Sequence, residues 1–106
     1  MEELMVKKEW KGKTLILELH GILDISTTGS IEPYLEDLED VNALVFDFSG
    51  LTFIDSTGIG SIMNAIYLSN EKHFKLQLQG VNEMTHQVFE IVGLYQILDA
   101  LQGEVI

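Results

Sequence analysis

The sequence predicts an α/β protein with a mixed β-sheet of four to five strands and helices packed mainly on one face. Residues 14–20 and 74–78 alternate apolar with polar side chains, as strands with one buried face do. Residues 43–48 form a short apolar run, interrupted by Asp47, which is typical of a central parallel strand. Residues 59–67 place apolar side chains at helical spacing between two of these strands. Crossovers of this kind are right-handed and join parallel strands.

The N-terminal part is expected to form an antiparallel hairpin and then a short helix. Residues 4–10 and 14–20 flank a Lys-Gly-Lys turn, which favours a hairpin. Apolar spacing predicts a helix over residues 30–38, with Pro33 in its first turn, where the missing N–H is tolerated. Several acids in this segment predict a solvated face, since they lack the spacing of a calcium loop. They are Glu32, Glu36, Asp37, Glu39 and Asp40.

The middle of the chain is expected to pass from the central strand into a long helix. The pair Ser49-Gly50 is expected to end the strand. The polar run 55–58 contains several residues that favour helix N-termini, and helical spacing continues from there to Asn70.

The C-terminal part is expected to hold a third helix, a last strand and a weak terminal helix. Asn82 is predicted to cap the third helix and Gly93 to end it. Residues 94–98 are expected to form the short strand, and residues 99–106 the terminal helix.

Composition excludes several classes of function. The chain has 106 residues and a net charge of -11, from 6 Lys+Arg against 17 Asp+Glu. Binding to a phosphate backbone or an anionic membrane surface needs basic residues, so neither nucleic acid nor membrane is an expected partner. The absence of Cys removes disulfides, thiolate zinc sites and thiol nucleophiles. The N-terminus lacks the apolar core of a signal peptide, and a cytoplasmic location is the simplest expectation.

Catalytic motifs are also missing. Gly58 and Gly60 are followed by Met63 where a dinucleotide fingerprint needs a third glycine. Ser56 lacks the glycine two residues earlier that a nucleophile elbow requires. The three His are dispersed along the chain. We therefore predict a protein that is not an enzyme, without a metal site or a cofactor.

Ser56 stands where a strand connection meets a predicted helix N-terminus. The first helical turn has free N–H groups and the positive end of the helix dipole, so a phosphate on Ser56 would be tolerated there. Gly58 and Gly60 carry no side chains, so a partner could approach the backbone closely. The residues alone leave a second interpretation open, in which Asp55, Ser56 and Thr57 only cap the helix and the glycines serve packing.

The segment VFDFSGLTFIDSTGIGSIMNAIY, residues 45–67, resembles the signature of the STAS domain. In particular it resembles bacterial anti-anti-sigma factors, also called anti-sigma factor antagonists. Its core D-S-T-G-I-G matches the family's D-S-[ST]-G-[LI]-G. GILDISTT at 21–28 is similar to the family's G-E-L-D-x-x-T element, and residues 82–98 are similar to its third helix and following strand. The resemblance implies that residues 1–106 form one STAS domain.

The resemblance implies a phosphorylation switch at Ser56. In this family an anti-sigma factor that is also a serine kinase phosphorylates this serine, and a serine phosphatase resets it. The unphosphorylated protein binds the anti-sigma factor and so releases the sigma factor. The residues that the resemblance assigns to partner binding are Asp24, Asp55, Ser56, Thr57, Gly58, Ile59 and Gly60. The oligomeric state is left open between a monomer and a weak dimer.

Physical reasoning is compatible with a switch. A phosphate adds about -1.5 to -2 charge at pH 7 and, beside Asp55, would repel an acidic partner without unfolding the helix. Ile22 departs from the family by standing where an acid is common, and Pro33 shortens the first helix. The alternative function is a STAS scaffold, or a subunit of a signalling or lipid-transport complex, that is never phosphorylated.

Overall fold

The protein folds around one five-stranded sheet of order β1-β2-β3-β4-β5. The computed structural model describes residues 3–36, 38, 40–101 and 103–106. The strands are β1 (Leu4–Lys11), β2 (Thr14–Leu23), β3 (Ala43–Ile54), β4 (Lys75–Gln79) and β5 (Glu104–Val105). The helices are the 3-10 turn η1 (Thr28–Ser30), α1 (Glu32–Glu36), α2 (Ser56–Lys72), α3 (Glu83–Ile91) and α4 (Leu94–Ala100).

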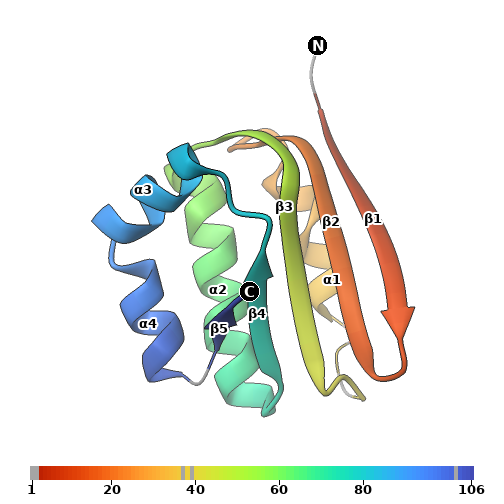
Figure 1. Cartoon of the computed structure of the whole chain (residues 1–106). Helices are drawn as coiled ribbons and strands as arrows, with labels where there is room; N and C mark the ends of the chain where they lie inside the picture. Colours follow the sequence, from red (N-terminus) through yellow and green to blue (C-terminus); the bar gives the residue numbers. More distant parts are fainter. Residues whose placement is uncertain (1–2, 37, 39, 102) are drawn as a thin grey trace.

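The mixed sheet predicted from the sequence is confirmed. β1 and β2 form the antiparallel hairpin, and β2, β3, β4 and β5 pair in parallel. Figure 1 shows α1 behind β2 and β3, and α3 and α4 beside α2. None of the helices in the described residues is long and apolar enough to cross a membrane.

One apolar core joins the sheet to the helices. The alternating leucines of β2, Phe46 and Phe48 of β3 and the leucines of β4 turn toward the same side of the sheet. Ile62 and Ile66 of α2 are fully buried against them, and Phe89 closes the core from α3. The full set of strand residues in this layer is Leu15, Leu17, Leu19, Leu23, Leu44, Phe46, Phe48, Leu51, Leu76 and Leu78.

The expected break at Ser49-Gly50 is wrong, because β3 runs through this pair to Ile54. The register against β2 shifts twice, between Glu18 and His20 and between Gly21 and Ile22. At each point β3 contains one residue more than β2, as in a β-bulge, which absorbs a residue without ending the strand. The long strand carries the chain to the edge of the sheet where α2 begins.

The expectation for the C-terminus is also wrong. Residues 94–98 belong to helix α4, and the chain ends in the short strand β5 in place of a terminal helix. Leu94 and Leu98 are both buried, and a spacing of four residues puts them on one side of a helix. Gly93, with φ of 75°, lies between α3 and α4 in the left-handed conformation that commonly follows the end of a helix.

The first helix is shorter than predicted. It begins with a 3-10 turn and its α-helical part ends at Glu36, whereas Leu38 is buried beyond it. Pro33 lies in the first turn of α1, as expected. Asp37 and Glu39 of the predicted acidic face lie outside the described residues.

Candidate functional site

The start of α2 lies at the carboxyl edge of the parallel strands. Leu23 at the end of β2 pairs with Ile54 at the end of β3, so the loops that follow these strands emerge side by side. Ser56 lies at the start of α2, as the sequence predicted, and it is exposed. The positive end of the dipole of this long helix therefore lies at the Ser56 side chain.

Asp55 joins the two loops through its two carboxylate oxygens. Oδ1 accepts a hydrogen bond from the Gly58 backbone N–H at 2.8 Å, and so caps α2. Oδ2 accepts a hydrogen bond from the Ile25 backbone N–H at 3.2 Å, across 30 positions of the chain. Of the three polar residues considered as caps, Asp55 is the one that fills the role.

Asp24 organises the loop after β2. Its Oδ1 accepts hydrogen bonds from the Ser26 hydroxyl at 2.7 Å and from the Ser26 N–H at 2.9 Å. The Thr27 hydroxyl accepts a hydrogen bond from the Asp24 N–H at 2.9 Å and donates one to the Ile22 carbonyl at 2.8 Å. The Ser26 hydroxyl is the main cause that lowers the pKa of Asp24, so this carboxylate stays ionised at neutral pH.

Two of the predicted site residues lie beneath the surface. A β-carbon on Gly58 would be 2.4 Å from the Leu23 carbonyl oxygen, so only glycine allows α2 to approach β2 this closely. Ile59 is 7% exposed and belongs to the core. Gly60 is exposed, and a β-carbon there would meet no atom within 4 Å. Gly58 and Ile59 therefore position the site, while Gly60 lies on its surface.

Hydroxyl groups continue along the exposed side of the helix start. Thr57 is exposed next to Ser56, and the Ser61 hydroxyl donates to the Thr28 hydroxyl at 2.9 Å. A hollow of about 260 Å³ lies between η1, α1 and α2. The sequence reasoning did not select Thr28, Ser61 or Ile25. The spacing of four residues between Thr57 and Ser61 could have indicated Ser61, whereas the positions of Thr28 and Ile25 depend on tertiary contacts.

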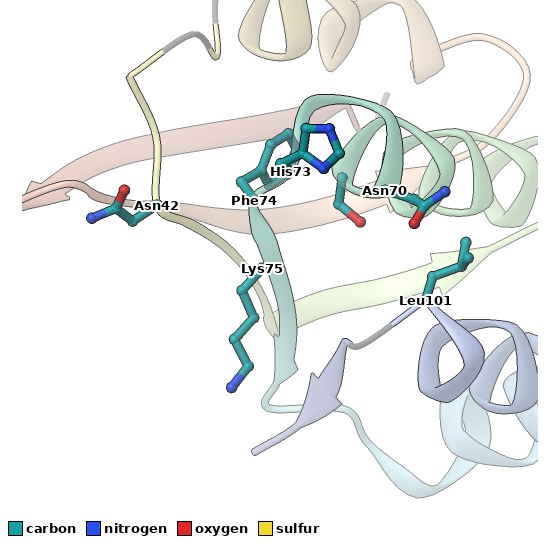
Figure 2. A pocket seen from close by; sticks show the side chains of 7 residues that line it. Asn42, Asn70, His73, Phe74, Lys75 and Leu101 are labelled. Atoms are coloured by element: carbon teal, nitrogen blue, oxygen red, sulfur yellow. The ribbon is translucent and has the colours of Figure 1, made fainter.

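A larger hollow, of about 530 Å³, lies at the opposite end of α2 (Figure 2). Two of its polar side chains, those of Ser69 and Lys75, are already engaged within the protein. The Ser69 hydroxyl donates to the Ile66 carbonyl at 2.6 Å, and the Lys75 ammonium lies 3.3 Å from a Glu104 carboxylate oxygen. In the described part of the chain, no three His, Asp or Glu side chains come together as a metal site.

The fold and the geometry at the start of α2 define a STAS domain. The family model of the STAS domain matches residues 5–104, and the chain belongs to this family. It is 27% identical over 105 residues to an anti-sigma F factor antagonist of Paenibacillus polymyxa, covering 96% of this chain and 90% of that protein. It is 22% identical over 102 residues to an anti-sigma-B factor antagonist of Staphylococcus aureus, with 94% of each chain covered.

Solved structures agree on the fold. The Bacillus cell fate determinant SpoIIAA in its phosphorylated form superposes with a TM-score of 0.73 at 19% identity. The superposition covers 96% of this chain and 91% of that one. At this identity the likeness establishes the fold alone.

Proposed function

We propose that this protein is an anti-sigma factor antagonist whose activity is switched by phosphorylation of Ser56. The observation that carries the proposal is an exposed serine hydroxyl at the first residue of α2, directly after a capping aspartate. The names of the similar proteins from Paenibacillus polymyxa and Staphylococcus aureus support the same function. So does the existence of a phosphorylated form of SpoIIAA.

In its unphosphorylated form the protein binds an anti-sigma factor and so releases the sigma factor. The surface available for this contact consists of the exposed residues Ser56, Thr57 and Gly60 together with the loop around Asp24. Gly58 and Ile59 contribute by holding that surface against β2 and the core. The carboxylates of Asp55 and Asp24 fix both loops by accepting hydrogen bonds from backbone N–H groups, so little conformational entropy is lost when a partner binds.

The partner is a serine kinase that acts on Ser56. To transfer a phosphoryl group, it must bring the terminal phosphate of ATP to the Ser56 oxygen, and it therefore presents an anionic ligand at this point of the interface. The oxygen attacks that phosphorus, its proton leaves to a base of the kinase, and ADP departs. A phosphate on Ser56 then occupies the same space and repels the anionic groups of the nucleotide.

Phosphorylation is expected to change binding much more than folding. The N-terminus of α2 favours an anion through the helix dipole, although the Gly58 N–H of its first turn is already bonded to Asp55. A loss of about 3 kcal/mol in binding corresponds to an affinity reduced by more than about 100-fold, which is enough for a switch. A serine phosphatase resets the switch, and the protein itself performs no catalysis. ATP, sigma factor and kinase meet in the cytoplasm, where we place this protein.

The test compares wild type, Ser56→Ala and Ser56→Asp. Each variant is titrated by calorimetry against the anti-sigma factor encoded in the same genome, with ATP or ADP present, and its phosphate is located by mass spectrometry. We expect Ser56→Ala to bind constitutively, Ser56→Asp to bind weakly, and the phosphate to lie on Ser56. Equal affinities for all three proteins, with phosphate on Thr57 or nowhere, would reject the proposal and favour an unmodified STAS scaffold.

A further inference from the structure

We infer that Ile25 is an apolar anchor of the partner interface and that Asp55 is the positioning residue that holds it beside Ser56. This inference rests on the proposed function and names two residues that set the affinity of that same site. The partner it fits is the kinase that phosphorylates Ser56, presenting an apolar pocket next to its nucleotide.

Ile25 is exposed but its backbone is fixed. The residue is 76% exposed. On either side of it, the Ser26 N–H donates to the Asp24 carboxylate at 2.9 Å, and the Thr28 N–H donates to the Asp24 carbonyl at 2.9 Å. An exposed apolar side chain on an ordered backbone favours binding, since burying it gains hydrophobic free energy and immobilises little.

Asp55 fixes the position of Ile25 relative to the modified serine. The Ile25 N–H donates to Oδ2 of Asp55, and Oδ1 of the same carboxylate caps the helix that begins with Ser56. One side chain therefore sets the spacing between the apolar contact and the phosphorylation site. A partner that places its nucleotide at Ser56 therefore finds Ile25 at a fixed position relative to that serine. Ser56 and Ile25 together can be recognised specifically.

Phe53 adds apolar surface at the same edge of the sheet. It is 51% exposed and pairs with Ile22, three residues before Ile25. The exposed residues at this end of the strands thus include Ser56 and Thr57, which carry hydroxyl groups, and Ile25 and Phe53, which are apolar. An apolar core with a polar rim is the usual composition of a protein interface.

The first experiment compares Ile25→Ala with Ile91→Ala. Ile91, on α3, is 84% exposed and is a matched control for removing the same atoms from an exposed position. Both variants should keep the wild-type melting temperature within a few degrees, because neither side chain is buried. Ile25→Ala should lower the affinity for the anti-sigma factor about tenfold or more, whereas Ile91→Ala should leave it unchanged.

The second experiment uses Asp55→Asn to separate the two hydrogen bonds. The Oδ1 atom of Asn can still cap α2, since Asn is as good an N-cap as Asp. Its amide nitrogen then faces the Ile25 N–H, donor against donor, so that hydrogen bond is lost. We expect faster hydrogen exchange at the Ile25 amide and a weaker complex, with the Gly58 amide still protected. If Asp55 only stabilised the fold, its substitution would not accelerate hydrogen exchange at the Ile25 amide alone.

The outcomes distinguish this inference from the proposed function. If Ser56→Asp weakens binding while Ile25→Ala binds like wild type, the inference fails and the switch stands. Unchanged exchange at Ile25 in Asp55→Asn overturns the positioning role in the same way. If the unphosphorylated wild type does not bind the anti-sigma factor at all, the proposed function fails and the inference falls with it.

Discussion

The two ends of helix α2 differ in what they offer to another molecule. At the N-terminal end, Ser56 and Thr57 project from a surface held together by the Asp55 and Asp24 carboxylates. At the C-terminal end lies the larger hollow of about 530 Å³ (Figure 2), yet the Ser69 hydroxyl and the Lys75 ammonium that border it are engaged within the protein.

The volume of the hollow at the C-terminal end of α2 does not make that end the better site for an anionic group. An anion is favoured at a helix N-terminus and disfavoured at a C-terminus, because the peptide dipoles point in one direction. The C-terminal end is closed instead by His73, which adopts a left-handed conformation with φ of 61°. The backbone direction of α2 therefore favours an anionic group at the Ser56 end over the His73 end.

The largest effect on stability should come from truncating a core side chain of α2. Ile62 of α2 is fully buried against the sheet. Ile62→Ala should lower the free energy of unfolding by about 2–5 kcal/mol, through lost burial and the cavity left behind. Denaturant unfolding measures the loss. An unchanged midpoint would contradict the burial of Ile62, and Met84→Ala, at a position 70% exposed on α3, is the control.

A pair of glycine substitutions tests the N-terminal end in opposite directions. Gly58→Ala would place a β-carbon 2.4 Å from the Leu23 carbonyl oxygen and should destabilise the fold by about 1–3 kcal/mol. Gly60→Ala meets no atom within 4 Å and should stabilise the helix by about 0.5–1 kcal/mol. Thermal denaturation of the two proteins side by side checks both signs. If both substitutions changed the stability by the same amount, α2 would not approach β2 as closely at Gly58 as described.

Much of this site could be predicted from local sequence, because its signals are local. Ser56 follows a capping acid and precedes a run with helical spacing, and both features lie within a few residues. The bond from the Ile25 N–H to Asp55 spans 30 positions and depends on the register of β2 against β3. No short-range pattern encodes it.

The errors in the predicted fold have physical causes of the same kind. Two leucines four residues apart, at 94 and 98, fit an alternating strand as well as a helix, and packing on the core selects α4. Ser49-Gly50 has the composition of a strand end. Pairing with β2 on one side keeps it in the sheet, and the bulges absorb the extra residues.

At the C-terminal end of α2, replacing His73, which has a left-handed backbone conformation, should change stability. His73→Gly should raise stability by about 1 kcal/mol or less, because glycine adopts the left-handed conformation without steric cost but loses more entropy on folding. Urea unfolding measures this gain. Affinity for the anti-sigma factor should stay at the wild-type value, since His73 lies at the far end of α2 from Ser56. A loss of affinity would show that the two ends of the helix are coupled.

The smallest effect compares the same charge at the two ends. Ser56→Asp adds a negative charge at the first residue of α2, and Asn70→Asp adds one near its last turn, where the side chain is also exposed. The dipole should make the first change neutral or favourable and the second unfavourable, by about 0.3–1 kcal/mol each at low salt. High salt should reduce the difference, because exposed charges are screened. Binding should show the reverse order, with Ser56→Asp weakening the complex and Asn70→Asp leaving it intact. If the two acids change stability equally, the helix dipole does not explain why the Ser56 end tolerates a phosphate.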